Sequence, residues 1–306
     1  MSAGGADRRP LITVVGATAT GKSDLGIALA RTLDGEIVNG DALQLYRGMD
    51  IGTAKLAPGD RGGVPHHLVD VLHVDEPASV SAFQRAARAA IAEIESRRRC
   101  ALLVGGSGLY VRAVTDDMRF PGTDPEVRAR LEAEAQAQGA QALHARLEQA
   151  DPPAAAKIAP GDVRRIVRAL EVMEITGEPF SAHLPEHAYV RPTVQLGLTL
   201  AREVLHARIA DRVERMWDAG WVEEVAGLVE RGLRADSTAG QAIGYAEVLA
   251  HLDGTMSRAE AVERTIVRTR QFAKRQETWF RRDRRITVLQ ADAPDLLEQA
   301  LAAVRA

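Results

Sequence analysis

Runs of hydrophobic residues alternate with segments of helical periodicity in the first third of the chain. The runs at residues 11–15 and 101–104, with a shorter one at 36–39, are typical of strands buried in a parallel sheet. Residues 24–30 and 80–98 repeat their apolar positions at helical spacing. This alternation of strand and helix predicts a parallel sheet covered by helices.

The pattern changes near Asp116, where the strand-like runs stop. Residues 121–185 contain helix-like segments rich in Ala, Arg, Glu and Gln. We expect helices to begin after Asp124 and Asp162, because an Asp at the N-cap accepts hydrogen bonds from the first turn, and we expect Asp151-Pro152-Pro153 to break a helix. The predicted domains are an all-helical insertion at residues 117–186 and a core formed by residues 1–116 and 187–306.

The strand pattern returns after the insertion. Residues 193–200 read as a strand that rejoins the sheet, and residues 285–289 read as a last short strand. Helices are predicted between them, to about residue 282. The chain therefore carries one sheet in two sequence segments.

The turn after the first predicted strand is the most informative motif of the chain. It reads Gly16-Ala17-Thr18-Ala19-Thr20-Gly21-Lys22-Ser23, which is the P-loop pattern in its proper place between a strand and a helix. Backbone N–H groups of such a turn converge on an anion, Lys22 adds a positive charge, and the Ser23 hydroxyl can ligate Mg²⁺. The predicted fold class is α/β, with a P-loop NTPase-like parallel sheet core flanked by helices and an inserted all-helical domain.

Two further sites are expected at the same edge of the sheet. Asp41 follows the strand at 36–39, and ligands of open α/β sheets bind beyond the carboxyl ends of the strands. Its carboxylate can take a proton or hold Mg²⁺ through water, although an Asp is also common in turns. The run that ends at Val104 continues as Gly105-Gly106-Ser107-Gly108, where many P-loop hydrolases place an Asp that organises Mg²⁺ and water. Hydrolytic machinery is therefore not expected.

Composition and charge restrict the class of protein. Hydrophobic residues make up 46% of the chain, which is enough for a substantial core, and the single cysteine, Cys100, permits no internal disulfide and no all-cysteine metal site. No run of 18 apolar residues exists and residues 1–10 lack an apolar signal core, so we expect a cytoplasmic protein without a membrane segment.

The positive charge of the chain is concentrated near its C-terminal end. The formal net charge is −3, yet residues 258–285 hold ten basic and four acidic side chains. Such a stripe either follows a phosphate backbone or forms a solvated helix face.

Six blocks of the sequence resemble the tRNA dimethylallyltransferases, also called isopentenyl-tRNA transferases. They occur in the order of that family and span residues 11 to about 285, nearly the whole chain. The block at residues 46–55 is the most specific of them. The blocks are Asp41 with Tyr46-Arg47-Gly48-Met49-Asp50-Ile51-Gly52-Thr53-Ala54-Lys55, Pro65-His66-His67-Leu68-Val69-Asp70, Gly105-Gly106-Ser107-Gly108-Leu109-Tyr110, Arg165-Ile166-Val167-Arg168-Ala169-Leu170-Glu171, Gln241-Ala242-Ile243-Gly244-Tyr245 and Thr269-Arg270-Gln271-Phe272-Ala273-Lys274-Arg275-Gln276.

The resemblance implies transfer of a dimethylallyl group from dimethylallyl diphosphate to N6 of adenosine 37, in tRNAs that read codons beginning with U. The P-loop would then hold the diphosphate of an isoprenoid together with Mg²⁺, which agrees with the missing acid after Val104. An adenine in the anticodon loop is stacked, so it would be extruded into the protein. The partners implied are the tRNA anticodon stem-loop and dimethylallyl diphosphate, with no obligate protein partner and a monomeric chain.

The resemblance also implies roles for individual residues. Asp41 would be the general base, Ser107 stands where the family commonly has Thr near the transferred group, and Arg212 matches a family arginine that binds diphosphate. The diphosphate would be bound by Gly16, Ala17, Thr18, Ala19, Thr20, Gly21, Lys22 and Ser23, with Ser23 as the metal ligand. The tRNA contacts would be Asp41, Ala42, Leu43, Gln44, Ser107, Arg164, Arg165, Ile166, Val167, Arg168, Arg270, Lys274 and Arg275.

Two departures from the family pattern and two other classes of function stay open at this point. The family usually has Ser at the position of Ala42 and often Gln at that of Arg164, which puts these base contacts in question.

An ATP-dependent kinase for a nucleotide or metabolite would share the P-loop and the basic helices, but would need an acidic Mg²⁺-organising group. A non-catalytic RNA-binding module would use the basic stripe alone and would not depend on Asp41.

Overall fold

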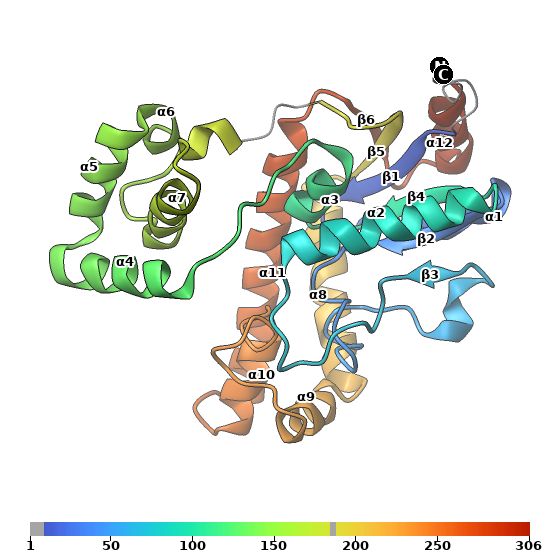
Figure 1. Ribbon diagram of the computed structural model, residues 1–306. Helices are drawn as coiled ribbons and strands as arrows, with labels where there is room; N and C mark the ends of the chain where they lie inside the picture. Colours follow the sequence, from blue (N-terminus) through green and yellow to red (C-terminus); the bar gives the residue numbers. More distant parts are fainter. Residues whose placement is uncertain (1–8, 184–187) are drawn as a thin grey trace, which may run out of the picture. The chain divides into compact units, whose positions relative to one another are not determined.

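The computed structural model describes residues 9–183 and 188–306. Six parallel strands form one sheet in the order β3-β2-β4-β1-β5-β6 (Figure 1). The order reverses at β1, because the chain first adds strands on one side of it and later adds two on the other, and such a reversal opens a crevice at the carboxyl edge. The strands are β1 (Leu11–Gly16), β2 (Gly35–Asn39), β3 (His66–His67), β4 (Cys100–Val104), β5 (Thr193–Thr199) and β6 (Ile286–Gln290).

Helices cover both faces of the sheet, as the continuous apolar runs predict. Every residue of β1, β2 and β4 is buried. One face packs against α2 (Val80–Ser96), α3 (Gly108–Thr115) and α11 (Arg258–Arg281). The other face packs against α1 (Lys22–Thr32) and α12 (Leu296–Arg305).

The predicted strands are confirmed with shifts of at most one residue at their ends, and the parallel α/β class is confirmed with them. The sequence interpretation missed β3 and α12. β3 has two residues, which is too short to show any periodicity, and its pairing with β2 depends on a distant part of the chain.

A third cluster of apolar side chains joins the segment between β2 and α2 to the C-terminal helices. It contains Tyr46 and Met49 from that segment and Trp217, Trp221 and Tyr245 from the helices. The helices concerned are α8 (Arg202–Asp218), α9 (Trp221–Glu230), α10 (Tyr245–Leu252) and part of α11. This cluster fixes the residues that follow Asp41 on a helical support.

Asp116–Ala188 forms a compact unit separate from the sheet unit, which comprises the residues up to Thr115 and Tyr189–Ala306. As expected, Asp124 and Asp162 cap two of its helices. Asp151 does not simply end a helix, because its side chain also caps the short helix that follows. The helices are α4 (Pro125–Gln138), α5 (Ala140–Ala150), α6 (Pro152–Ala155), α7 (Val163–Thr176) and the 3₁₀ turn η2 (Phe180–His183).

A buried carboxylate organises this helical unit. Glu171 is fully buried and accepts hydrogen bonds from Arg128, Arg168 and the backbone N–H of Asp124. Burial opposes its ionisation, but the hydrogen bonds from the two arginines outweigh burial and lower the pKa of Glu171. In the parts of the chain that the structure describes, no helix is long and apolar enough to span a membrane.

Candidate active site at the carboxyl edge of the sheet

The phosphate loop connects β1 to α1 and places its backbone at the carboxyl edge. Gly16 has φ +145°, and a Cβ there would lie 2.6 Å from the carbonyl oxygen of Leu198 on β5, so only glycine fits. Gly21 is the N-cap of α1 in a left-handed conformation, and no side chain accepts a hydrogen bond at this helix terminus. The N–H groups of the first turn are therefore available to bind an anion.

Two half-buried cations face this loop. Lys22 donates to the carbonyl of Ala17 over 2.7 Å, and burial lowers the pKa of its amine to about 8 while Asp41 opposes that change and Arg212 adds to it. Nη1 of Arg212, on α8, lies 3.4 Å from the Thr18 hydroxyl. The structure thus brings Lys22 and Arg212 to the same loop from elements almost 200 residues apart.

Asp41 is held beside the loop by the residue that ends β2. The Asn39 amide donates to the carbonyls of Asp41 and Leu68 over 2.9 Å each, and its oxygen accepts the Asp41 N–H over 2.9 Å. One carboxylate oxygen of Asp41 accepts the N–H of Leu43 over 2.9 Å. Burial raises the pKa of the Asp41 carboxyl, against the opposing effects of the Leu43 N–H and of Lys22. A carboxylate of raised pKa is a stronger base than an exposed one.

The glycine turn after β4 completes the edge. The N–H of Gly40 donates to the carbonyl of Val104 over 2.7 Å, and a Cβ on Gly105 would lie 2.2 Å from the carbonyl carbon of Gly40. No side chain fits at residue 105, which explains why the acid of P-loop hydrolases has no place here. Ser107 Oγ accepts the N–H of Ala42 over 3.4 Å and so joins the turn to the Asp41 segment.

Gln276 on α11 links the phosphate loop to this glycine turn. Its oxygen accepts the N–H of Thr18 and its nitrogen donates to the carbonyl of Gly106, each over 2.9 Å. The sequence interpretation gave Gln276 no role, although it ends one of the family blocks. Only the contacts, which join residues 170 and 258 positions apart, reveal it.

Glu224 on α9 was also missed, and it supports the segment that follows Asp41. It accepts the N–H groups of Asp50 (3.0 Å) and Ile51 (2.7 Å) and the hydroxyl of Tyr245 (2.6 Å). The turn that it fixes continues to Thr53, whose carbonyl accepts the amide of Gln44 over 3.1 Å. Glu224 on α9 therefore helps to position Gln44, a residue expected to contact RNA bases, through the turn that contains Thr53.

We expect Glu224→Ala to lower the free energy of unfolding by about 2–3 kcal/mol, because two backbone donors and one buried hydroxyl lose a charged acceptor. Thermal or urea denaturation measures the change. The matched control is Glu223→Ala, because Glu223 is exposed and we expect a change within about 0.5 kcal/mol. Equal stability of the two variants would contradict the role given to Glu224.

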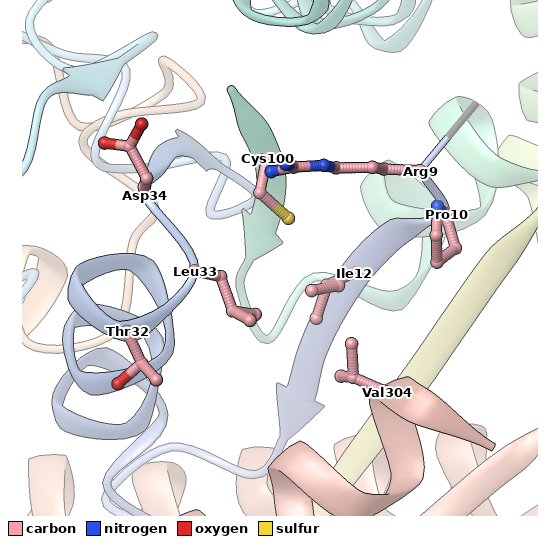
Figure 2. A pocket seen from close by; sticks show the side chains of 8 residues that line it. All are labelled: Arg9, Pro10, Ile12, Thr32, Leu33, Asp34, Cys100 and Val304. Atoms are coloured by element: carbon pink, nitrogen blue, oxygen red, sulfur yellow. The ribbon is translucent and has the colours of Figure 1, made fainter. Parts of the chain in front are cut away.

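A cavity of about 430 Å³ lies at the opposite, amino edge of the sheet and is not part of this site (Figure 2). It is lined by Ile12 and Cys100 near the starts of β1 and β4 and by Val304 of α12, with Arg9 and Asp34 at its polar side. Burial raises the pKa of the Cys100 thiol, which keeps it in the unreactive protonated form. The cavity therefore brings no chemistry to the carboxyl edge.

The basic stripe of residues 258–285 divides into two parts. Near its start, Arg258 pairs with Asp218 over 2.6 Å, while Arg264 and Arg268 both pair with the buried Glu247. Further along, five exposed cations have no carboxylate within ion-pair distance in the described residues 9–183 and 188–306. These are Lys274, Arg275, Arg281, Arg282 and Arg284. The positive charge left for a partner therefore lies near the end of α11 and just beyond it.

The residues expected to contact RNA from the helical unit differ in accessibility. Arg164 and Arg165 are exposed. Ile166 and Val167 are 0% and 3% exposed in the core of the unit, so their side chains pack inside it, and the expected contact of these two residues with RNA stays a prediction. Arg168 is half-buried and donates to Glu171 and to the carbonyls of Pro121 and Gly122, so it supports the helical unit, and its expected contact with RNA stays a prediction.

Fold and site together define a class: a P-loop protein whose phosphate cradle lies beside a half-buried carboxylate, with no acid after the neighbouring strand. Comparison with known proteins identifies the family within that class. The chain belongs to the IPP transferase family, whose model matches residues 44–283. The resemblance expected from the sequence blocks is thereby confirmed.

Individual relatives are similar over nearly the whole chain. The chain is 61% identical to the tRNA dimethylallyltransferase of Kineococcus radiotolerans, over 95% of this chain and 94% of that protein. It is 57% identical to the enzyme of the same name from Thermobifida fusca, over 96% and 94%. Among solved structures, the tRNA isopentenylpyrophosphate transferase of Bacillus halodurans has 40% identity and a TM-score of 0.71, covering 97% of this chain and 95% of that one. A eukaryotic dimethylallyltransferase acting on tRNA has 28% identity and a TM-score of 0.82, covering 96% and 78%.

Proposed function

We propose that this protein is a tRNA dimethylallyltransferase, which moves a dimethylallyl group from dimethylallyl diphosphate to N6 of adenosine 37 in tRNAs that read codons beginning with U. Family membership and the names of the relatives support this function over a kinase. The observation that carries it is the position of Asp41 beside the phosphate loop: Ala42, the next residue, is bonded to Ser107 of the glycine turn, and Gln276 bonds that turn to the loop. A base next to a leaving-group site suits transfer of carbon to nitrogen.

The reaction needs one bond made and one broken. The N6 lone pair forms a bond to the first carbon of the allyl group, and the bond from that carbon to the diphosphate oxygen breaks with its electron pair. Lys22, Arg212 and the N–H groups of the loop stabilise the departing diphosphate. The Asp41 carboxylate accepts the proton that N6 loses. Ser107 holds the Asp41 segment through the N–H of Ala42.

The loop residues fit a shared Mg²⁺ site rather than a cage built by the protein. Ser23 is half-buried and lines a cavity of about 30 Å³ with Asn39 and Gln44, and the described residues contain no group of three His, Cys, Asp or Glu that could hold a metal ion. Mg²⁺ keeps several waters and takes substrate phosphate oxygens as ligands, so one hydroxyl is a sufficient protein contribution. When bound, the ion neutralises charge on the diphosphate.

The RNA would be bound by exposed cations and by the Asp41 segment. Arg270 and Lys274 line a groove of about 250 Å³ between α8 and α11 together with Arg202 and His206, and this groove suits backbone phosphates. Arg164 and Arg165 of the helical unit are proposed to contact the anticodon stem-loop, as is Arg275 of α11. Asp41, Ala42, Leu43, Gln44 and Ser107 would face the target bases. We place the reaction in the cytoplasm, carried out by a monomer without an obligate protein partner.

The test is incubation of the protein with Mg²⁺, dimethylallyl diphosphate and unmodified tRNA, followed by mass analysis of the nucleosides. We expect one adenosine, at position 37, to gain a dimethylallyl group. A matched reaction with ATP in place of the allylic diphosphate tests the kinase alternative and should give negligible turnover. An unmodified tRNA together with rapid ATP turnover would overturn the proposal.

The lowered pKa of Lys22 predicts a pH effect on diphosphate binding. The amine is charged below about pH 8 and neutral above it, so the affinity for inorganic diphosphate should fall as pH rises through about 8. An ordinary lysine would keep its charge to roughly pH 10. Isothermal titration between these two pH values measures the effect. In Lys22→Arg the charge persists and the fall should disappear, so a fall that remains in this variant would contradict the assignment.

A further inference from the structure

One tryptophan of this protein lies at the surface beside the candidate site. The chain has three tryptophans. Trp217 and Trp221 are 4% and 1% exposed in the cluster under α8 and α9, whereas Trp279 on α11 is 39% exposed. An exposed indole is a large apolar surface in contact with water, so its position needs a reason.

The position of Trp279 is fixed by the glycine turn of the site. A Cβ on Gly108 would lie 2.2 Å from Cδ1 and Nε1 of the indole, which shows that the ring packs directly against the backbone one residue after Ser107. One turn earlier on α11, Gln276 is bonded to Gly106 and to the phosphate loop. Leu109, 41% exposed, follows Gly108. An apolar surface of Trp279 and Leu109 therefore adjoins the segment that carries Ser107.

Two basic side chains that form no ion pair with a described residue flank Trp279. Arg275 precedes it by four residues and Arg282 follows it by three, which places the three side chains on one side of the helix and its end. Both arginines are exposed, and no described carboxylate lies within ion-pair distance of either. A basic surface with an aromatic ring at its centre is the arrangement that binds unpaired nucleotides, because cations attract the backbone while the ring stacks on a base.

We propose that Trp279, with Leu109 beside it, is a stacking platform for an unpaired base of the RNA loop, adjacent to the base that reacts. The inference rests on the proposed function, which brings a single-stranded RNA loop to Asp41 and Ser107. Extruding the target base leaves its neighbours without a stacking partner on one side. The Trp279 indole replaces that partner and holds the loop open. Arg275 and Arg282 pair with the phosphates on either side.

Intrinsic fluorescence tests this directly, because the other two tryptophans are buried. Binding of unmodified tRNA should quench the emission of the protein and protect it from iodide. Trp279→Leu should remove both effects, and the control Trp217→Phe should retain them. An RNA-dependent quenching that persists in Trp279→Leu would overturn the proposal. Protection from iodide needs only the unaltered protein, so the test holds even if the variant does not fold.

Kinetics separate stacking from a structural role of the ring. In Trp279→Leu we expect the KM for tRNA to rise about tenfold, as loss of one stacked base implies, with the KM for dimethylallyl diphosphate unchanged. Trp279→Phe keeps an aromatic face and should recover most of the affinity. A parallel rise in both KM values, or no rise for tRNA, would indicate that the ring only packs on Gly108 and would reject the platform.

The two proposals fail in different ways. If the unaltered protein transfers no dimethylallyl group to tRNA, the proposed function is wrong, whatever the fluorescence shows. If transfer occurs and tRNA leaves the Trp279 emission unchanged, the function stands and the platform is rejected.

Discussion

Asp41→Asn should lower kcat for dimethylallyl transfer by about 10²–10⁴-fold, the range that a positioned general base contributes. The substitution keeps an oxygen that accepts the Leu43 N–H over 2.9 Å, so the local backbone is preserved while the proton acceptor is lost. We therefore expect the KM values for tRNA and for dimethylallyl diphosphate to change only a few-fold. Steady-state rates at saturating concentrations of both substrates measure the effect.

The control for this variant is Asp60→Asn, which changes an exposed carboxylate in the 3₁₀ turn η1 (Pro58–Arg61). It removes the same charge from the same unit and should leave the rate unchanged. A kcat of Asp41→Asn within tenfold of that of the control would reject Asp41 as the base. That result would not bear on the proposal that the loop binds phosphate.

Lys22→Met should lower kcat/KM for dimethylallyl diphosphate by about 10²–10³-fold, comparable to the loss of one preorganised donor at a developing anion. The methionine side chain has nearly the length of lysine but no charge. The fold should not suffer, because the variant removes a cation whose desolvation already lowers its pKa to about 8. Thermal denaturation should therefore show an unchanged or raised melting temperature.

Arg31→Met is the matched control for Lys22→Met, since Arg31 is an exposed cation in the last turn of the same helix. We expect it to keep full activity. A loss smaller than tenfold in Lys22→Met would mean that Arg212 and the backbone N–H groups carry the diphosphate by themselves.

Local patterns predicted five of the six strands because each of these contains a run of apolar residues, and the runs of β1, β2 and β4 stop at Gly16, Asn39 and Gly105. The P-loop lies where its motif predicted for the same reason: a left-handed Gly21 and a positive φ at Gly16 are local requirements of the turn. β3 was not predicted because a two-residue strand has no pattern of its own and is defined only by its pairing with β2. The helix caps at Asp124 and Asp162 were predictable because a capping Asp needs only its next three residues.

Contacts between distant segments could not be predicted in this way. Gln276 and Glu224 look like ordinary helix residues, and their roles depend on which loops the fold brings to them. The basic stripe also shows that the partners of a side chain cannot be predicted from its local sequence. Its arginines look equivalent in the sequence, yet Arg258 and Arg268 are paired with acids from other helices, and Lys274 and Arg282 are not.

The close approach of Gly40 and Gly105 has a consequence for how this protein can change over time. A Cβ at residue 105 would lie 2.2 Å from the backbone of Gly40, so no single substitution there introduces the carboxylate that water-activating P-loop enzymes use. The ends of β2 and β4 would first have to move apart, which would break the hydrogen bond from Gly40 to Val104. Descendants of this sequence are therefore separated from nucleotide hydrolysis by a backbone rearrangement, even though they carry the same phosphate loop.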